Sequence, residues 1–413
     1  MQLFDIPGEA AFVLERLQSA EYAAYVVGGC VRDTILGDKP KDWDVTTSAL
    51  PDEVKLVFQD LPVVETGIRH GTVTVLAGEK RMPIEVTTFR TEFGYSDNRR
   101  PDKVKFVADI KEDLSRRDFT INALAFNGKD EIIDLFGGRY DIKERLIRCV
   151  GDPELRFDED ALRILRALRF SAVLGFEIEK NTASAIHSKR GLLKNIAAER
   201  IFSEFKQLLC GKDAARVLCG FCDVIAEFLP ETEPIDNRTL RAVAAAGQSA
   251  ELRAAILLRG RKISDAEAAL RRLKPDNKFV NNVAALIERC GGELPDTDGG
   301  IRRRLCECGA DMFLRLLDMR RAYAIADADE FELCRIDSVM RAVQETIDSG
   351  ECFALKDLAI GGGDCIALGL KGREIGRALN DALLAVMDGK LENNKCELIR
   401  YIEDKRNMDN QTT

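Results

Sequence analysis

The sequence predicts an α+β protein, with a small mixed β-sheet and helices in an N-terminal head and an all-helical extension after it. In residues 1–135, short β-branched runs alternate with helical spacings, and these runs fade after about residue 140. Beyond that point Ala, Leu, Arg and Glu recur at spacings of three and four, which is typical of helices. The length of 413 residues also predicts two to four domains.

The expected elements of the head run in the order helix, strand, helix and two further strands. Apolar residues recur every three or four positions in 12–17 and in 52–58, which indicates helices. Val, Ile and Thr dominate 24–27, 72–76 and 84–88, as they do in strands. In the helical part, segments rich in glycine or proline predict joints at 211–213, 230–234, 291–300 and 361–363.

The charge balance is acidic, with 61 Lys and Arg against 70 Asp and Glu and a formal net charge of -9. Taken as a sum, this balance argues against a nucleic-acid-binding protein, but steering depends on where the charges lie. We therefore interpret the local clusters of cations as places where RNA or nucleotide could lie, and expect few phosphate contacts with a shallow salt dependence. These clusters are Arg99–Arg100, Arg116–Arg117, Arg163 with Arg166 and Arg169, Arg271–Arg272 and Arg302 to Arg304.

The cysteine and histidine contents exclude several kinds of site. Twelve cysteines are spread through the chain without the paired spacing of a zinc site, so we expect reduced thiols that are mostly buried. With only His70 and His187, a multi-histidine metal site is excluded, and carboxylates and cationic side chains must carry any catalysis. No apolar run approaches the ~18 residues of a spanning helix, and the N-terminal segment does not resemble a secretory signal.

Gly28 and Gly29 follow an apolar run and precede a helical pattern that contains Arg32. Glycine lets a backbone approach a ligand closely, and a helix N-terminus presents free N–H groups to an anion. Arg32, one turn into the helix, could reach a triphosphate. The alternative is an ordinary strand-to-helix turn with Arg32 and Asp33 as surface charges, which the double glycine alone would favour.

Three carboxylates form a second pattern. In a strand, residues two apart point to the same face, so Asp42 and Asp44 should project together and suit Mg²⁺ between them. The alternative is a pair of solvated acids in a turn. Glu85 lies in an otherwise apolar strand, where a buried carboxylate should face a cation or a partner. A structural glutamate in a salt bridge is the alternative for that residue.

Taken together, Gly-Gly, Asp-x-Asp and a later isolated acid resemble the nucleotidyltransferase superfamily that includes DNA polymerase β. Further motifs are similar to the class II tRNA nucleotidyltransferases, the bacterial and eukaryotic-type CCA-adding enzymes. These motifs are 87–101 (TTFRTEFGYSDNRRP, similar to the flexible loop of the family), 113–126 (DLSRRDFTINALAF), 134–138 (DLFGG), 156–170 (RFDEDALRILRALRF) and, more faintly, 369–376 (GLKGREIG). The strong part of the resemblance covers residues 22–205.

The resemblance implies site residues by motif. The implied catalytic residues are Asp42, Asp44 and Glu85, the first two as ligands of Mg²⁺. The implied nucleotide-binding residues are Gly29, Arg32, Arg117, Asp160, Arg163, Arg166 and Arg169, with 159–163 (EDALR) as the element that selects the nucleotide.

The selecting element also has a physical interpretation. On one helix, Asp160 and Arg163 would share a face, with apolar residues packing the other side and the polar pair presented outward. Cytosine and adenine offer an amino donor beside a ring-nitrogen acceptor, which a carboxylate and a guanidinium complement. Guanine and uracil place a carbonyl acceptor and an N–H donor at these positions instead, so they would not match. A good bidentate contact contributes ~1–3 kcal/mol to discrimination between bases. The alternative is an ordinary salt bridge on an amphipathic helix.

The resemblance implies template-independent addition of C, C and A to the 3′ end of tRNA from CTP and ATP. The reaction would be in-line attack of the 3′-hydroxyl on the α-phosphate at a two-metal site, with diphosphate leaving. The expected domains are a nucleotidyltransferase head (1–138), a helical neck with the selecting helix (139–210), a helical body (211–300) and a tRNA-binding helical tail (301–413). The expected partners are ATP, CTP and the tRNA acceptor stem and T-arm region, with no membrane or obligatory protein partner and a cytoplasmic location.

Three alternatives stay open. An enzyme that adds only the terminal A shares these motifs, although an intact loop at 95–101 favours complete CCA addition. Bacterial poly(A) polymerase shares the head but usually carries more basic extensions. A non-enzymatic RNA-binding protein with a decayed head is disfavoured by the intact acids. Since no histidine follows His187, we expect no histidine-aspartate phosphohydrolase domain of the kind that some family members carry.

Overall fold

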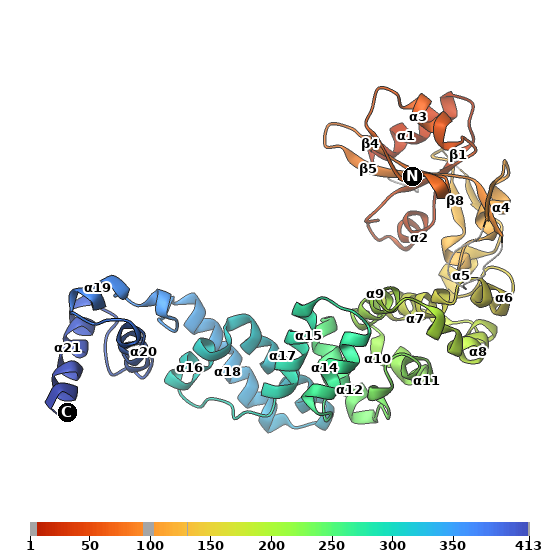
Figure 1. The fold of residues 1–413 in the computed structure, drawn as a ribbon. Helices are drawn as coiled ribbons and strands as arrows, with labels where there is room; N and C mark the ends of the chain where they lie inside the picture. The colour runs from red at the N-terminus through yellow and green to blue at the C-terminus, as the bar shows by residue number, and fades with distance from the viewer. Residues whose placement is uncertain (1–5, 94–102, 130, 412–413) are drawn as a thin grey trace. The chain divides into compact units, whose positions relative to one another are not determined.

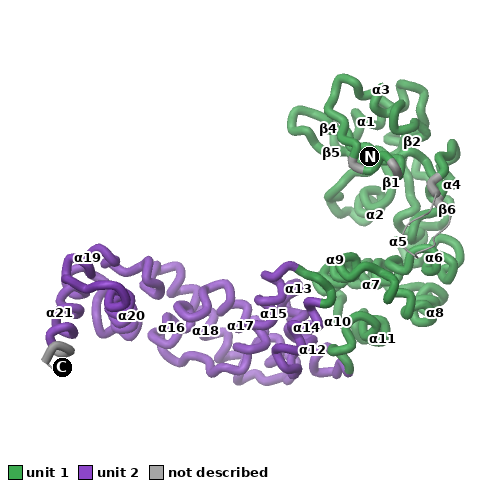
Figure 2. The backbone as a smooth tube through the Cα atoms, viewed as in Figure 1, with its two compact units in different colours: residues 1–233, 272–275 green, residues 234–271, 276–413 purple. Residues whose placement is uncertain are grey.

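The computed structural model describes residues 6–93, 103–129 and 131–411. The chain divides into two compact units, residues 1–233 with 272–275 and residues 234–271 with 276–413 (Figure 2). The division after Glu233 falls within the joint predicted at 230–234. The finer division into head, neck, body and tail stays a prediction.

A mixed β-sheet of seven strands organises the first part of unit 1 (Figure 1). The strands of unit 1 are Ala24–Val27 (β1), Asp44–Thr47 (β2), Val63–Gly67 (β3), Thr72–Ala77 (β4), Met82–Thr88 (β5), Arg90–Phe93 (β6), Lys103–Phe106 (β7), Leu124–Phe126 (β8), Ile132–Asp134 (β9), Leu146–Ile147 (β10) and Glu177–Ile178 (β11). The order in the sheet is β3-β4-β5-β2-β1-β8-β9, and β2 with β5 is its only parallel pair in the part of the chain described. The three strands predicted from the sequence are confirmed.

The sheet forms where β-branched residues can bury one face. Val45, Val73 and Val86 are buried in neighbouring strands, so their side chains form the centre of the head. The helices of unit 1 are Gly8–Ser19 (α1), Gly29–Leu36 (α2), Pro51–Val57 (α3), Ile110–Ser115 (α4), Gly138–Glu144 (α5), Pro153–Glu159 (α6), Leu162–Leu174 (α7), Lys180–Lys189 (α8), Ala198–Leu209 (α9), Ala214–Gly220 (α10) and Cys222–Ala226 (α11), with short 3₁₀ turns between them. The two predicted helices correspond to α1 and α3.

The helices of the head lie on both sides of the sheet. Helix α1 packs against β1 and β4 through Val13, Leu14 and Leu17, which recur at helical spacing and are buried. Helix α2 contacts β1 and β8, and Figure 1 shows it on the side opposite to α1 and α3. The α+β fold class is confirmed, with one difference. The extension after residue 140 is not wholly helical, because β10 and β11 pair in parallel beside α7.

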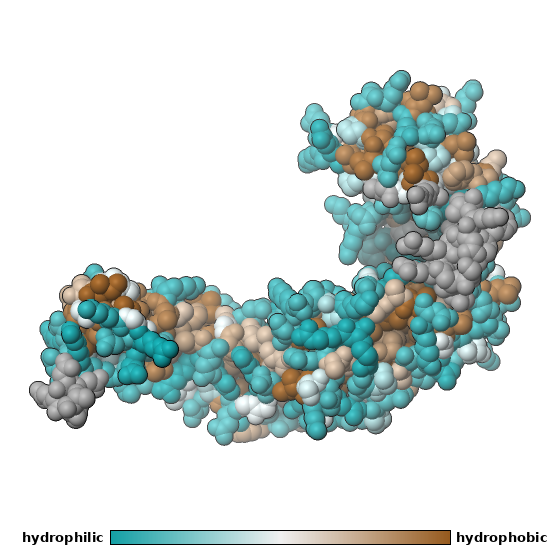
Figure 3. Space-filling model, viewed as in Figure 1, coloured by the Kyte–Doolittle hydropathy of each residue, from teal (hydrophilic) through white to brown (hydrophobic). Residues whose placement is uncertain are grey.

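All regular secondary structure in the described residues of unit 2 is helical. Its helices are Asn237–Ala245 (α12), Ala250–Leu258 (α13), Ile263–Arg272 (α14), Asn277–Arg289 (α15), Asp298–Cys308 (α16), Ala310–Asp327 (α17), Glu330–Asp348 (α18), Gly362–Ala367 (α19), Arg373–Met387 (α20) and Lys395–Gln411 (α21). One apolar core joins α16, α17 and α18, and a second joins α19, α20 and α21. Hydrophilic side chains cover much of the visible face of this unit (Figure 3). In the part of the chain described, no helix combines the length and apolarity needed to cross a membrane.

All twelve cysteines are free thiols, as predicted. The expectation that most are buried is wrong. Five are buried, whereas five others are exposed, all of them on helices: Cys219, Cys222, Cys306, Cys334 and Cys396. Their small side chains can occupy a polar helix face because a single exposed apolar group is ordinary at a protein surface.

Candidate active site

The Gly28–Gly29 turn joins β1 to α2. Gly28 has a φ of +84°, which disfavours any residue with a Cβ, and its N–H donates to the Leu124 carbonyl at 3.0 Å. A Cβ at Gly28 would lie 3.0 Å from Nη1 of Arg117. The glycine therefore provides both the sharp turn and the room for Arg117, and the N-terminus of α2 begins directly beside that guanidinium.

Arg32 lies on α2 and is buried. Its Nη1 donates to Oδ1 of Asn122 at 2.6 Å, its Nε donates to Oδ1 of Asp33 at 2.8 Å, and its guanidinium lies 5.2 Å from the ring centre of Phe170. The alternative of a surface charge is thus wrong for Arg32. Three partners hold its orientation, so it presents a fixed positive charge rather than a mobile side chain.

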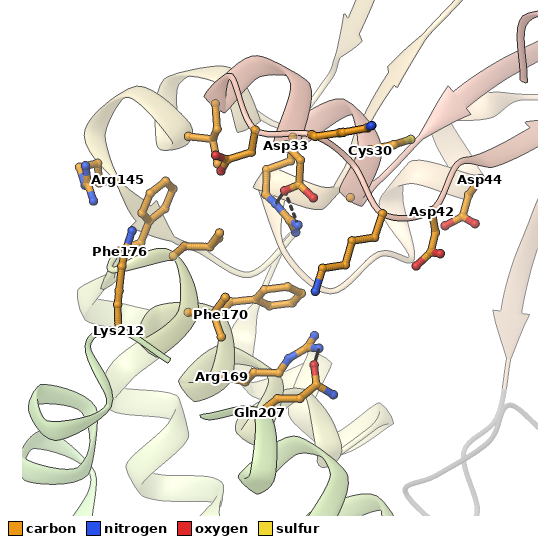
Figure 4. Close-up of a pocket in the computed structure, with 18 residues that line it drawn as sticks. Cys30, Asp33, Asp42, Asp44, Arg145, Arg169, Phe170, Phe176, Gln207 and Lys212 are labelled. Atoms are coloured by element: carbon orange, nitrogen blue, oxygen red, sulfur yellow. Dashed lines mark hydrogen bonds and ion pairs between the residues drawn. The ribbon is translucent and has the colours of Figure 1, made fainter. Parts of the chain in front are cut away.

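Asp42 and Asp44 both line one cavity (Figure 4). Trp43, between them, is buried on the opposite side, as alternation along an extended chain requires. Only Asp44 is in β2, and Asp42 lies in the segment that leads into it. In the parallel pairing of β2 with β5, Glu85 lies directly opposite Asp44. The expectation that Glu85 is buried is wrong, because it is on the exposed face of β5 with Asp44 as its neighbour.

The acids repel one another. The pKa of Asp44 is raised to about 6, first because neighbouring protein displaces water from around it and then because Glu85 is negatively charged. Arg117 acts in the opposite direction, and Asp42 adds a smaller repulsion. A cation between Asp42 and Asp44 would relieve this repulsion. Burial raises the pKa of Cys30, which lines the same cavity, to about 11, so its sulfur stays protonated and the available donors are oxygen atoms.

These donors fit a hard divalent cation bound by two carboxylates and a substrate phosphate. Among the described residues, no group of three or more His, Cys, Asp or Glu is arranged to hold a metal ion. The donor pair is therefore Asp42 with Asp44, and the role of Glu85 as a third acid stays a prediction.

A buried ion pair links the head to α7. Asp118 accepts from the backbone N–H of Phe119 at 2.8 Å, from Nδ2 of Asn122 at 3.1 Å and from Nε of Arg166 at 2.8 Å. Burial acts to raise the pKa of Asp118, but the charge of Arg166, the hydrogen bonds from Asn122 and Arg166, and the charge of Arg163 outweigh it and lower this pKa to about 2. Asp118 and Asn122 were not among the predicted site residues. The sequence could have indicated both as site residues, because they lie within the 113–126 motif close to Arg117.

The element 159–163 differs from the predicted single helix. Helix α6 ends at Glu159, Asp160 is extended with φ of -139°, and α7 begins at Leu162. The helix breaks because the Asp160 side chain accepts from the Leu162 N–H at 3.1 Å, and Asp160 also contacts Arg200 at 3.3 Å. The prediction that Asp160 and Arg163 both face outward is wrong for Arg163, which is buried. Its guanidinium donates to Glu159 and to the carbonyls of Arg156 and Arg116.

Three guanidinium groups lie close to the ring of Phe170 on α7. Those of Arg169, Arg32 and Arg166 lie 4.2, 5.2 and 5.4 Å from the centre of its ring. Buried Glu204 on α9 contacts Arg169 at 2.9 Å and Arg166 at 4.0 Å, so both arginines are anchored from a second helix. The sequence interpretation missed Phe170 and Glu204, because only the packing of α7 against α9 and the head gives them these partners.

The cavity has a volume of about 770 Å³ and extends between α2, the segment before β2, and α7. Figure 4 shows Asp42 and Asp44 on one side and Phe170, Arg169 and Gln207 on another. The predicted site residues that line it are Gly29, Arg32, Asp42, Asp44 and Arg169. The predicted residues outside its lining are Glu85, Arg117, Asp160, Arg163 and Arg166, and of these the first two act on Asp44 electrostatically.

Most arginines of the predicted cation clusters are paired with acids. The ion pairs are Arg116–Asp113, Arg117–Asp113, Arg163–Glu159, Arg166–Asp118, Arg169–Glu204, Arg272–Glu231, Arg302–Glu351, Arg303–Asp388 and Arg304–Glu307. These acids reduce the local positive field, since an exposed pair retains little net field. The interpretation that RNA or nucleotide lies at these clusters stays a prediction. Arg99–Arg100 and the predicted flexible loop at 95–101 lie outside the described residues.

Comparisons with known proteins agree with this arrangement. Residues 24–148 match the poly A polymerase head domain, and residues 175–235 match a probable RNA- and SrmB-binding site of polymerase A. The CCA-adding enzyme of Lactobacillus delbrueckii subsp. bulgaricus is 38% identical over 415 residues, 97% of this chain and 99% of that protein. That of Enterococcus faecalis is 35% identical over 417 residues, 98% of each chain. The crystal structure of the Bacillus stearothermophilus CCA-adding enzyme in complex with CTP has a TM-score of 0.79 at 32% identity, and the match covers 99% of this chain and 100% of that one.

Proposed function

This chain belongs to the family of CCA-adding enzymes, and on that premise we propose that it adds C, C and A to the 3′ end of tRNA from CTP and ATP without a nucleic-acid template. The observation that carries the proposal is the single cavity lined by Asp42, Asp44, the start of α2 and Arg169. It combines paired carboxylates with guanidinium groups and backbone N–H groups held in fixed orientations, which is what nucleotidyl transfer from a triphosphate requires. A cytoplasmic location is part of this proposal, because the proposed substrate is tRNA.

The residues of α2 would bind the triphosphate. The backbone at Gly29 and the guanidinium of Arg32 lie on the cavity wall, and Arg117 lies beside the Gly28 turn. Because Arg32 is held by Asn122 and Asp33, its charge needs no reorganisation when the nucleotide arrives. The 3′-hydroxyl of the RNA would then attack the α-phosphate in line, and diphosphate would leave on the side of α2.

Asp42 and Asp44 would hold Mg²⁺. When bound there, Mg²⁺ supplies neutralisation of the phosphate charge and lowers the pKa of the attacking hydroxyl. The repulsion between Asp44 and its acidic neighbours supports this assignment, because a bound divalent cation would keep all of them ionised. Glu85 would contribute negative charge next to Asp44.

Asp160 and Arg163 would select the base. The two backbone carbonyls and the Glu159 carboxylate that accept from Arg163 hold its guanidinium rigidly, and Arg200 with the Leu162 N–H holds Asp160. A rigid acceptor and a rigid donor discriminate by geometry, because a base that places a carbonyl against the carboxylate would leave buried polar groups unpaired. This mode of selection does not require the pair to lie on one helix.

Primer extension on a tRNA that ends at the discriminator base tests the proposal, with CTP and ATP supplied separately and together. We expect two C residues with CTP alone and complete CCA with both. Addition of A alone would select the A-adding type, long A tracts would select poly(A) polymerase, and no product would refute nucleotidyl transfer to tRNA.

A further inference from the structure

The cavity continues away from Asp42 and Asp44 to a second group of cations, as Figure 4 shows for Arg145 and Lys212. We propose that Arg145 and Lys212 form a separate phosphate-binding subsite, which holds a backbone phosphate of the RNA substrate while its 3′ end is extended. The identity of the substrate, RNA, rests on the function proposed above. The geometry of the subsite, however, does not involve Asp42 or Asp44.

Both cations converge on Gly175, which ends α7 with a φ of +69°. A Cβ at Gly175 would lie 2.8 Å from Cε and 3.7 Å from Nζ of Lys212, and 3.6 Å from Nη2 of Arg145. Because glycine has no side chain, the cationic groups of Lys212 and Arg145 can both lie close to this position. The Arg145 guanidinium also lies 5.4 Å from the ring centre of Phe176, which fixes its direction.

Two acids that are neighbours of these residues in the sequence pair with another arginine, and among the described ion pairs none joins Glu144, directly before Arg145, to either cation. Arg216 contacts Asp213 at 2.6 Å and Glu177 at 2.8 Å, and these residues directly follow Lys212 and Phe176. Among the described ion pairs, none joins Arg145 or Lys212 to an acid, in contrast to the arginines of α7. Two like charges held together without a counter-charge attract an anion.

The backbone of Arg145 bears on the choice of a control. Arg145 ends α5 with a φ of +56°, a conformation that glycine or asparagine adopts with less strain than arginine. Arg81 has a similar φ of +51°, so this backbone conformation is not specific to the subsite.

A polymer fits this region better than a second free anion. Leu36 lines both the main cavity and an adjoining open groove, and that groove carries the exposed cations Arg139 and Lys143 beside the exposed ring of Tyr140. Successive cations with an aromatic ring suit a nucleic acid strand, because phosphates bind the cations and a base stacks on the ring. A nucleotide triphosphate, by contrast, would occupy the start of α2.

The test compares Arg145→Asn and Lys212→Gln with two matched controls. Arg81→Asn makes the same change at an exposed arginine with a φ of +51°, and Lys180→Gln removes an exposed lysine at the start of α8, outside the cavity lining. Binding of a tRNA that ends at the discriminator base is measured by fluorescence anisotropy between roughly 50 and 200 mM salt. The KM values for CTP and ATP are measured on the same proteins.

We expect each subsite variant to weaken tRNA binding several-fold and to reduce the slope of log K against log salt by about 1, with the KM values unchanged. Both controls should bind as the unaltered protein does. Unchanged tRNA affinity and slope in the subsite variants would overturn the proposal. A raised KM for nucleotides with unchanged tRNA affinity would also overturn it and assign the cations to the triphosphate. If the unaltered protein adds no nucleotide, the proposed function fails, while the binding measurement still decides the subsite.

Discussion

Replacing Asp118 by Asn should test the buried ion pair that joins the head to α7. The change keeps the size of the side chain and removes its charge. In the folded protein Asp118 accepts from the Phe119 N–H, from Asn122 and from Arg166, so the substitution leaves the partly buried Arg166 guanidinium with Glu204, at 4.0 Å, as its remaining described ion-pair partner. We expect a clear loss of stability in unit 1.

The size of this loss follows from the pKa. Asp118 has a pKa of about 2 in the folded protein, against an ordinary value of 3.8. A difference of that size corresponds to roughly 2–3 kcal/mol of folding free energy at neutral pH. Because the folded pKa is the lower one, this stabilisation is present above about pH 4 and is lost as the pH falls through about 2. The difference between the two proteins should therefore shrink over that range.

Urea unfolding followed by tryptophan fluorescence is the suitable assay. Trp43 is the only tryptophan of the chain, and it is buried in unit 1, between Asp42 and Asp44 in the sequence. Its signal therefore reports the unit that contains Asp118, even if the two units unfold separately. The free energies of unfolding are compared at neutral pH and at several values between pH 4 and 2.

Asp60→Asn is the matched control, since it removes a carboxylate paired with Arg16 at an exposed site and should have a smaller effect. The reasoning is refuted if Asp118→Asn unfolds with the same free energy as the unaltered protein at neutral pH. A loss that stays constant from neutral pH to pH 2 would refute the electrostatic origin of the effect.

The remaining predictions concern the active site. Asp42→Asn and Asp44→Asn should each abolish nucleotide incorporation without lowering the free energy of unfolding in urea, and normal turnover in either variant would contradict the metal assignment. Addition of Mg²⁺ to protein treated with EDTA should restore incorporation and alter Trp43 fluorescence, whereas an unchanged signal would argue against binding beside that residue. Arg163→Ala should admit UTP and GTP in primer extension and, by removing the donor to the part-buried Arg116 carbonyl, destabilise unit 1 by ~1–3 kcal/mol. Complete exclusion of UTP and GTP would refute base selection by Arg163. The affinity for tRNA should fall with salt less steeply than the slope of about -10 known for lac repressor, and an equally steep slope would contradict the small number of phosphate contacts.

Local patterns in the sequence were sufficient for the parts of the fold that depend on neighbouring residues. The β-branched runs became β1, β4 and β5, and the double glycine became the sharp turn into α2. Asp42 and Asp44 reach one cavity because alternation along an extended chain places residues two apart on one side. The helix expected across 159–163 failed for a local reason that spacing alone does not reveal, since Asp160 accepts from a backbone N–H and starts a new helix.

Only the tertiary structure decided which distant groups meet. Glu85 lies beside Asp44 because β5 pairs in parallel with β2, and strand register depends on burial across the whole sheet rather than on either strand. The pairing of Arg166 with Asp118 and of Arg169 with Glu204 turned clusters that look cationic in the sequence into neutral, rigid walls. The sequence by itself determined the residue types of a nucleotidyltransferase site and their order. Packing determined which of these charges are neutralised and which stay free to bind a ligand, because net local charge depends on neighbours in space.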